Sequence, residues 1–222
     1  MLRVLLISLI FICSVTAEKA KVVACVGDSN TQRAYPAILQ KQLGSDWKTI
    51  NCGIGAATVV DGTFRPYHKM KQYQQALSTK ADFIIIMLGT NDANPRWWTK
   101  DRKSDFKGTF QEEFKKRYLD LIASFKKLES KPRLILAVPL PIFPKKAKEA
   151  NRDNTAGRNK NFNEIIVPII REIAEKEKLP LVDIQKQLSK DEKLCTDGVH
   201  FNKEGYAKMS SAFAEKLKEL AK

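Results

Sequence analysis

The amino-acid sequence predicts an α/β protein of three layers, in which helices cover both faces of a mostly parallel five-stranded sheet. From Lys21 onward, short apolar runs alternate with stretches of helical periodicity, as in sheets whose parallel strands are connected by helices. The chain has 222 residues, 43% of them hydrophobic, and contains neither an internal repeat nor a Gly- or Ser-rich linker. We therefore expect residues 18–222 to form a single domain with a full core.

Five short apolar runs are typical of buried strands, because a strand that is covered on both faces needs no polar alternation. The last run is the shortest. The predicted strands are Lys21–Val26, Trp47–Asn51, Phe83–Leu88, Leu134–Val138 and Leu181–Ile184.

Apolar side chains at three- and four-residue steps predict helices that pack on this sheet. One helix covers residues 110–128 and another covers residues 162–173. Pro168 lies within the second helix and is expected to kink it or to move its start. A last helix begins near Asn202, whose side chain can cap it, and extends through the apolar positions of residues 206–220.

Residues 1–17 have the pattern of a cleaved secretory signal. Arg3 precedes the apolar run Val4–Cys13, and small residues surround Val15–Ala17. A membrane anchor is the alternative, but the run is shorter than the roughly 20 apolar residues that a spanning helix needs. The sequence therefore predicts a secreted or periplasmic protein without stable membrane insertion.

Three cysteines remain after this signal, namely Cys25, Cys52 and Cys195. An odd number in an oxidising compartment leaves at least one thiol free or buried, and their pairing stays open. Their wide spacing resembles no zinc site, and we expect neither a metal nor a cofactor.

The chain is strongly basic, with 39 Lys and Arg against 25 Asp and Glu and a formal net charge of +14. This excess favours acidic partners such as anionic polysaccharide, a phosphorylated surface or nucleic acid. Several of the basic residues lie in residues 139–160, after Pro139, Pro141 and Pro144. We predict a long exposed loop there, either a lid or binding element or a solvated excursion without a task.

Polar residues follow the predicted strands, at the edge of a parallel sheet where ligands bind. The first strand ends in Gly27–Asn30, the second in Asn51–Ala56 and the third in Gly89–Asp92, and Asp197–His200 lies near the C-terminus. Together these segments supply a hydroxyl, an amide, a carboxylate and an imidazole. This set of groups is typical of acyl transfer through a serine hydroxyl.

In such chemistry Ser29 is the nucleophile, and it needs a base to accept its proton as it attacks. Histidine suits this task because its unperturbed pKa is about 6.5. The chain has two histidines, and only His200 has a carboxylate, Asp197, at a spacing that one short turn can span. His68 lies between Tyr67 and Lys69 without such a motif. We therefore predict Ser29, His200 and Asp197 as the catalytic residues.

The negatively charged intermediate also needs hydrogen-bond donors for its oxyanion. The backbone N–H groups of Ser29 and Ala56 and the side-chain amide of Asn91 are the predicted donors. Each segment alone has a simpler explanation, a turn or a helix cap, but all four in one chain favour an active site. A flavin-binding protein would share the sheet and would leave Asn91, Asp197 and His200 without a task.

In order and spacing, these four segments resemble those of the SGNH or GDSL hydrolases, a family of serine esterases, over nearly the whole mature chain. The resemblance implies a flavodoxin-like SGNH hydrolase fold and a carboxylic ester hydrolase. Two positions depart from the family pattern. Asn30 stands where Leu or Ile usually follows the serine, and Ala56 stands where glycine is common. The Ala56 N–H is therefore the less secure oxyanion donor.

Clues to the substrate come from residues near the third segment. Asn51–Gly55 and the pair Trp97–Trp98 look most similar to family members that act on acetylated sugars, such as sialate O-acetylesterase-like proteins. We expect Asp28, Trp97 and Trp98 to contact the substrate, although the two indoles could equally pack their own loop. Arg65 and Arg96 could steer an anionic substrate.

The sequence thus predicts hydrolysis of short acyl esters, acetyl above all, on a small molecule or glycan. A lysophospholipase or thioesterase of the same fold and an inactive basic carbohydrate-binding protein are the alternatives. Nucleic acid is not an expected partner, and its binding would weaken steeply with salt. The oligomeric state stays open.

Overall fold

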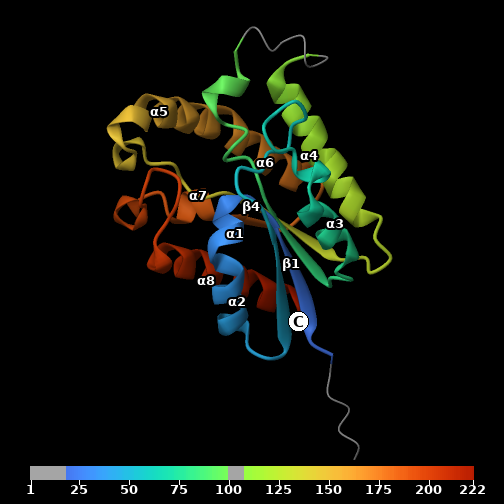
Figure 1. The fold of residues 1–222 in the computed structure, drawn as a ribbon. Helices are drawn as coiled ribbons and strands as arrows, with labels where there is room; N and C mark the ends of the chain where they lie inside the picture. The colour runs from blue at the N-terminus through green and yellow to red at the C-terminus, as the bar shows by residue number, and fades with distance from the viewer. Residues whose placement is uncertain (1–18, 100–107) are drawn as a thin grey trace, which may run out of the picture.

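The computed structural model describes residues 19–99 and 108–222. The predicted signal at residues 1–17 lies outside the described residues. Within the described ranges, no helix has the length and apolar character that crossing a bilayer requires. Figure 1 shows a central sheet whose strands are connected by helices.

The sheet has five strands, and every neighbouring pair in it is parallel. The order across the sheet is β2-β1-β3-β4-β5, which is the flavodoxin-like order. This confirms the predicted fold class, and the strand boundaries differ from the predicted ones by no more than two residues. The strands are β1 (Lys21–Gly27), β2 (Trp47–Gly53), β3 (Phe83–Met87), β4 (Arg133–Val138) and β5 (Leu181–Asp183).

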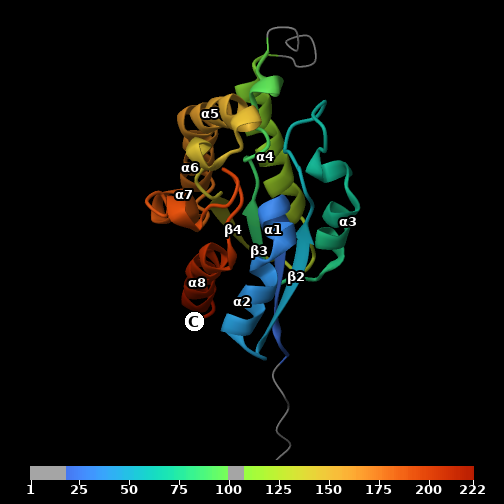
Figure 2. The ribbon, with the colours of Figure 1, turned by 60° about the vertical axis from the view of Figure 1, so that its left-hand side comes forward.

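Helices cover both faces of the sheet, because alternate strand residues point to opposite sides and both sets are apolar. Val23, Cys25 and Ile85 pack against α2 (Tyr35–Leu43), α7 (Ile184–Gln187) and α8 (Lys203–Leu220). Ala24 and Ile84 pack against α3 (Lys71–Ser78), α4 (Phe110–Lys126) and α6 (Val167–Lys176). In Figure 2, α8 and α3 stand on opposite sides of the strands.

Helix boundaries follow local chemistry. A capping box of Thr109 and Glu112 begins α4. The Asn202 side chain accepts a hydrogen bond from the Gly205 N–H and begins α8, as predicted. Pro168 follows a π-helical turn at Phe162–Ile166, which connects α5 (Arg152–Asn161) to α6 without a break in the helix. The proline therefore does not set a new helix start, and the wider turn before it accommodates its ring and its missing N–H.

The prediction of a long exposed loop at residues 139–160 is wrong. Helix α5 (Arg152–Asn161) and the single turns Pro144–Lys146 and Glu149–Asn151 occupy most of this segment. Leu140, Ile142 and Ala147 are buried. The helix was missed because its sequence is almost wholly polar, so no apolar period marks it. Packing on neighbouring segments decides its conformation.

Cys25, Cys52 and Cys195 are buried and form no disulfide.

The remaining short elements connect these layers. The short helix α1 (Ser29–Arg33) follows β1 directly. The other single turns are Tyr67–Lys69, Pro95–Trp97 and Glu192–Leu194.

Candidate active site

The strand order places two of the predicted segments beside each other. The connections leave β1 and β3 toward opposite edges of the sheet, which opens a crevice at the carboxyl ends of these two strands. Ser29 begins α1 directly after β1, and Asn91 follows β3. The loop after β2 brings Ala56 to the same edge, since the Ile54 N–H donates to the carbonyl oxygen of Gly27 at 3.1 Å.

Ser29, His200 and Asp197 form one hydrogen-bonded series. The Ser29 Oγ lies 2.8 Å from the His200 Nε2, and the His200 Nδ1 lies 2.7 Å from the Asp197 Oδ2. Because a carboxylate can only accept, the ring carries its proton on Nδ1, and Nε2 is then the acceptor for the Ser29 hydroxyl. A serine in this arrangement can pass its proton to the imidazole as it attacks a carbonyl carbon.

The loop that carries this pair is short and cross-braced. The Asp197 Oδ1 accepts from the N–H groups of His200 at 2.9 Å and Val199 at 3.1 Å. Partial burial raises the pKa of Asp197, but hydrogen bonds from the His200 ring and these N–H groups outweigh it and leave the pKa below its usual range. Asp197 therefore stays ionised and can stabilise an imidazolium.

Gly198 allows the turn between Asp197 and His200, since its φ of +100° is in the region that side chains avoid. A Cβ there would lie 3.1 Å from the Thr155 Cγ2 of α5. The Phe143 N–H also donates to the Gly198 carbonyl oxygen at 2.9 Å. Residues of the 139–160 segment thus support the turn that holds the imidazole.

The three predicted oxyanion donors differ in their hydrogen-bond acceptors within the protein. Ser29 holds the first position of α1, where an N–H has no acceptor within the helix. Among the described residues, no acceptor engages the Ala56 N–H. The Asn91 Nδ2 donates to the carbonyl oxygen of Ala57 at 3.0 Å and contacts the Asp28 Oδ2 at 3.4 Å. The longer contact is the one that an oxyanion would displace.

Ala56 adopts a left-handed backbone conformation, with a φ of +60°. This explains why glycine is common at the position, since an alanine there bears a strain of about 1 to 2 kcal/mol. The Gln32 side chain steadies the turn, because its Oε1 accepts from the Gly55 N–H at 2.8 Å.

Asp28 does not lie where a substrate would meet it. Its side chain is 1% exposed and caps α1 by accepting from the Asn30 N–H at 2.9 Å. Burial raises its pKa, against the hydrogen bond from the Asn30 N–H that lowers it. Asp28 is therefore a buried cap of α1, and the expectation that it contacts the substrate does not fit this position.

The two tryptophans also differ from the expectation. The Trp97 Nε1 donates to the Asn91 carbonyl oxygen and the Trp98 Nε1 to that of Asp92, each at 3.0 Å. Trp98 packs on Phe110 in the core, away from the crevice. Trp97 is 8% exposed and lines a cavity beside Asn91. Both indoles hold the Asn91 segment in place, and of the two only Trp97 lines the cavity.

Asp92 holds the residues that follow the second segment. Its Oδ1 accepts from the N–H groups of Val59 at 2.8 Å and Val60 at 3.2 Å. Its Oδ2 is buried without a hydrogen-bond partner. Burial is the largest cause that raises the pKa of Asp92, to about 7, and the neighbouring Asp28 adds to it.

Asn30 is a residue of the site whose role the sequence did not show. It is buried, its Nδ2 donates to the Val199 carbonyl oxygen at 3.3 Å, and its Oδ1 accepts from the Tyr206 hydroxyl at 2.9 Å. It therefore ties the helix that begins at Ser29 to the loop that carries His200. The polar residue in place of Leu or Ile was the signal that could have indicated this.

A cavity of about 290 Å³ adjoins the oxyanion donors. Ala56 and Asn91 form one end, and Trp97 forms part of the wall. The other lining residues are Thr58, Phe64, Asn94, Arg96 and Arg158. Phe64 and Arg158 were not predicted as site residues, because neither belongs to a motif and they come from separate segments.

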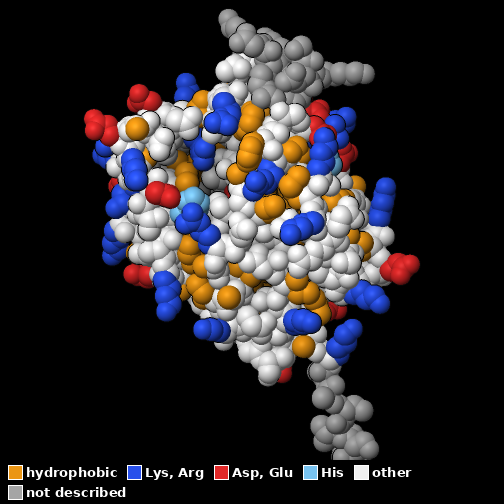
Figure 3. Space-filling view, viewed as in Figure 1, with side chains coloured by type: hydrophobic (Ala, Val, Ile, Leu, Met, Phe, Trp, Pro, Cys, Tyr) orange, Lys and Arg blue, Asp and Glu red, His pale blue; other side chains and the backbone are white. Residues whose placement is uncertain are grey.

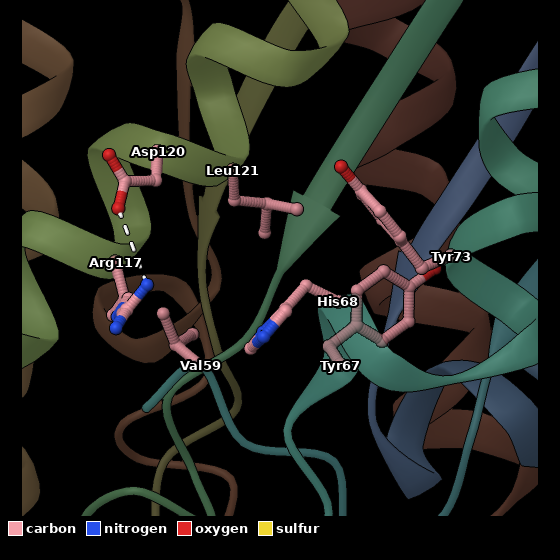
Figure 4. A pocket seen from close by; sticks show the side chains of 7 residues that line it. All are labelled: Val59, Tyr67, His68, Tyr73, Arg117, Asp120 and Leu121. Carbon is pink, nitrogen blue, oxygen red and sulfur yellow. Dashed lines mark ion pairs between the residues drawn. The ribbon is translucent and has the colours of Figure 1, made fainter. Parts of the chain in front are cut away.

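His68, the other histidine, lies in a different cavity of about 170 Å³ (Figure 4). Its Nε2 lies 3.2 Å from the Asp61 Oδ1, and the cavity is also lined by Tyr73, Arg117 and Leu121. No serine or cysteine lines this cavity. Within residues 19–99 and 108–222, no three His, Cys, Asp or Glu side chains gather as metal ligands would.

The fold and the Ser29 series together define a class of protein, the α/β hydrolases that carry a serine, histidine and aspartate at the carboxyl ends of a parallel sheet. Residues 22–208 match the model of the GDSL-like lipase/acylhydrolase family. The chain belongs to this family, as the resemblance of its four segments predicted.

One known relative is named as an esterase. The chain is 30% identical over 220 residues to a protein of Xylanibacter ruminicola named acetylxylan esterase, with 90% of this chain and 44% of that protein covered. The chain thus spans less than half the length of that relative.

Solved structures share the fold at lower identity. A carbohydrate acetylesterase family member from Sinorhizobium meliloti has a TM-score of 0.67 at 21% identity, covering 90% of this chain and 98% of that one. The aryl esterase of M. smegmatis has a TM-score of 0.66 at 19% identity, covering 90% and 100%.

Proposed function

We propose that this protein is a serine esterase that removes short acyl groups, acetyl above all, from carbohydrates. The observation that carries the proposal is the uninterrupted series from Ser29 through His200 to Asp197, with contacts of 2.8 and 2.7 Å. Support for the substrate comes from the acetylxylan esterase to which the chain is 30% identical. The predicted signal at residues 1–17 makes secretion part of this proposal.

In the first half of the reaction, the Ser29 Oγ attacks the ester carbonyl carbon while the His200 Nε2 takes its proton. The Ser29 and Ala56 N–H groups and the Asn91 amide hold the oxyanion, and each such donor contributes about 2.7 to 4 kcal/mol. The imidazolium then gives its proton to the departing alkoxide, which leaves as the alcohol. Asp197 orients the ring and stabilises its charge throughout.

In the second half, water attacks the acyl-enzyme with His200 as base. The proton of the water passes to Nε2 and then to the Ser29 Oγ as the acid is released. The reaction thus consumes one water for each ester, and Ser29 ends as a free hydroxyl.

The test compares the protein lacking residues 1–17 with its Ser29→Ala variant on p-nitrophenyl acetate, p-nitrophenyl octanoate and acetylated xylo-oligosaccharides. We expect turnover of both acetates, slower turnover of octanoate and no turnover by the variant. Faster cleavage of octanoate than of acetate would favour a lysophospholipase or thioesterase. Binding of the oligosaccharides without turnover would favour an inactive carbohydrate-binding protein.

A further inference from the structure

Helix α5 lies against two segments of the active site. On one side, a Cβ on Gly157 would come within 2.6 Å of the Pro95 Cγ, in the turn that carries Trp97. On the other side, Thr155 is close enough to meet a Cβ on Gly198, in the His200 loop. The Asn154 Nδ2 also contacts the Asn94 Oδ1 at 3.4 Å. The helix therefore bridges the Asn91 and His200 sides of the crevice.

This position brings two guanidinium groups to one cavity. Arg158 of α5 and Arg96 of the turn before Trp97 both line the cavity that begins at Asn91. The two groups are close enough for the charge of Arg96 to lower the pKa of Arg158. Two positive charges beside one cavity repel each other, and an anion bound between them would offset this repulsion.

No carboxylate of residues 19–99 or 108–222 forms an ion pair with either guanidinium. Among the described residues, no ion pair or side-chain hydrogen bond engages Arg158, and its Nε is buried without an acceptor. Burial lowers the pKa of Arg158, partly against the attraction of Asp28 and Asp197. Arg96 lies over the Trp97 ring, 5.3 Å from its centroid, and no described carboxylate pairs with it. Arg158 is half-buried and Arg96 is exposed, so the buried Nε of Arg158 is the group for which a bound anion would recover most free energy.

An aromatic ring stands at the mouth of the same cavity. Phe64 is 66% exposed, and it is the large hydrophobic side chain that the described surface leaves most open. Arg65 lies beneath it, with its guanidinium 5.1 Å from the ring centroid and its Nη1 donating to the Gly55 carbonyl oxygen at 2.8 Å. The ring is thus supported on one side and free on the other. A flat, exposed ring beside polar groups suits the apolar face of a sugar.

From this geometry we propose that the cavity binds the carboxylate of an acidic sugar, so that the substrate is an acyl ester of a uronic acid. Arg96 and Arg158 hold the carboxylate, and the free face of Phe64 receives the sugar ring. This inference rests on the proposed function and names the substrate class of the same site.

The sugar, and not the acyl group, is the part that meets Arg158. His200 protonates the departing alcohol, so the alcohol lies on the His200 side of Ser29. Arg158 is on this side as well, since its helix contacts Gly198 and its charge acts on Asp197. A charged group on the sugar is therefore within the field of Arg158.

The positive charge of the whole surface is a competing explanation for any preference for anions. Lys and Arg are spread over the face shown in Figure 3 and are not gathered at one place. Steering by such a surface is long-ranged and changes little when one of its charges is removed. Arg152, which is exposed at the start of α5, provides the matched control because it has the same charge outside the cavity.

The experiment measures acetate release from three acetylated methyl glycosides that differ at one carbon: glucuronic acid, glucose and glucose 6-sulfate. For the wild type, we expect kcat/KM for the uronic acid to exceed that for glucose by roughly 10- to 100-fold, as for a hydrogen-bonded ion pair. Arg158→Gln and Arg96→Gln should each bring this ratio down toward one, and Arg158→Lys should restore part of it. Arg152→Gln should keep the wild-type ratio.

Three outcomes would overturn the proposal. They are an equal kcat/KM for the uronic acid and glucose esters, an equal loss of the ratio in Arg152→Gln and Arg158→Gln, and a preference for the sulfate over the carboxylate. The first would leave the esterase proposal intact, because acetate would still be released.

A binding measurement separates failure of the site from failure of the reaction. NMR titration of Ser29→Ala with methyl glucuronoside and methyl glucoside needs no turnover. Tighter binding of the acid, lost on adding Arg158→Gln, would support the subsite even if no ester were cleaved. Equal affinity for the two glycosides would overturn it, whatever the activity.

Discussion

The molecule contains two histidine–aspartate pairs, and their difference shows what makes such a pair catalytic. His200 contacts Asp197 through Nδ1 at 2.7 Å, and His68 contacts Asp61 through Nε2 at 3.2 Å. Both rings are partly buried, with side-chain exposures of 14% and 35%. A histidine beside a carboxylate is thus a feature of both regions, and it does not identify the base.

The other contacts of each pair make the difference. The Nε2 of His200 faces the Ser29 hydroxyl, whereas Asp61 is shared among His68, Lys69 at 2.7 Å and Arg117 at 3.0 Å. Burial, the largest cause, lowers the pKa of His68. The pair at Asp61 therefore belongs to a network of ions that joins the loop before α3 to α4, and Figure 4 shows His68 and Arg117 on these two elements. The pair at Asp197 ends on the Ser29 hydroxyl.

The largest effect is expected from replacing each of the two histidines in turn with glutamine. His200→Gln should lower kcat on p-nitrophenyl acetate on the order of 10⁵- to 10⁶-fold, because it removes the acceptor of the Ser29 proton. His68→Gln should leave kcat within about twofold, as is usual away from special contacts. Initial rates of the purified proteins check both. Equal losses in the two variants would contradict the assignment of the base.

The two aspartates offer the next comparison. Asp197→Asn should lower kcat by about 10⁴-fold, since the ring would lose its preferred tautomer and its stabilising charge. Asp61→Asn should act on stability and leave kcat nearly unchanged, because Lys69 and Arg117 would lose their shared partner. Rates and urea unfolding, measured side by side, separate the two effects. An Asp61→Asn protein that folds normally but is inactive would show that the second pair takes part in the reaction.

Substitution of Asn30 tests the position of the His200 loop without changing His200 or Asp197. Asn30→Leu leaves the Tyr206 hydroxyl and the Val199 carbonyl oxygen without a partner, at a cost of about 1 to 3 kcal/mol in the free energy of unfolding. We expect kcat to fall by up to roughly 100-fold as the His200 loop shifts against Ser29. Tyr206→Phe, which removes one of the two contacts, should lose less of each. Lost stability with an unchanged kcat would show that Asn30 does not position the loop.

The last prediction concerns stability and not turnover, and it depends on pH and the buried carboxyl of Asp92, which holds Val59 and Val60 in the segment that leads to Asp61. Burial raises the pKa of Asp92 to about 7, so the folded protein keeps a proton that the unfolded chain releases near its usual value. Stability should therefore fall as pH rises from about 4 to 7, by up to roughly 1.4 kcal/mol for each unit.

The aspartates of the two pairs act in the opposite sense. The pKa of Asp197 and that of Asp61 are below the usual range, because hydrogen bonds and nearby cations outweigh burial, so their contribution is lost as pH falls through these values. Asp92→Asn keeps the acceptor for both N–H groups and should flatten the decline from pH 4 to 7 in urea unfolding. The same decline in the variant and the wild type would mean that Asp92 is ionised in the folded protein.

Much of the site followed from local sequence because its residues come directly after strands. A run such as Phe83–Met87 predicts a strand by itself, and parallel strands bring Ser29 and Asn91 to one edge. The turn from Asp197 to His200 is equally local. These expectations needed only the order of the residues along the chain.

Other residues were out of reach because their roles depend on distant partners. Asn30 contacts Val199 and Tyr206, which follow it by 169 and 176 positions. Helix α5 has no apolar stripe, so only its contacts with Pro95 and Gly198 explain its place. Trp97 and Trp98 looked like a sugar platform, but their N–H groups bind carbonyl oxygens of their own loop.

The sequence by itself thus determined the alternation of strands and helices, the parallel sheet and the segments that carry the nucleophile, the base and Asn91. Each of these depends on neighbouring residues and on the side-chain periods of helix and strand. Only the tertiary structure decided that the Asp28 side chain is buried and caps α1, that Asn30 links α1 to the His200 loop, and that Arg96 and Arg158 line one cavity. Such relations join segments far apart in the chain, and packing alone brings those segments together.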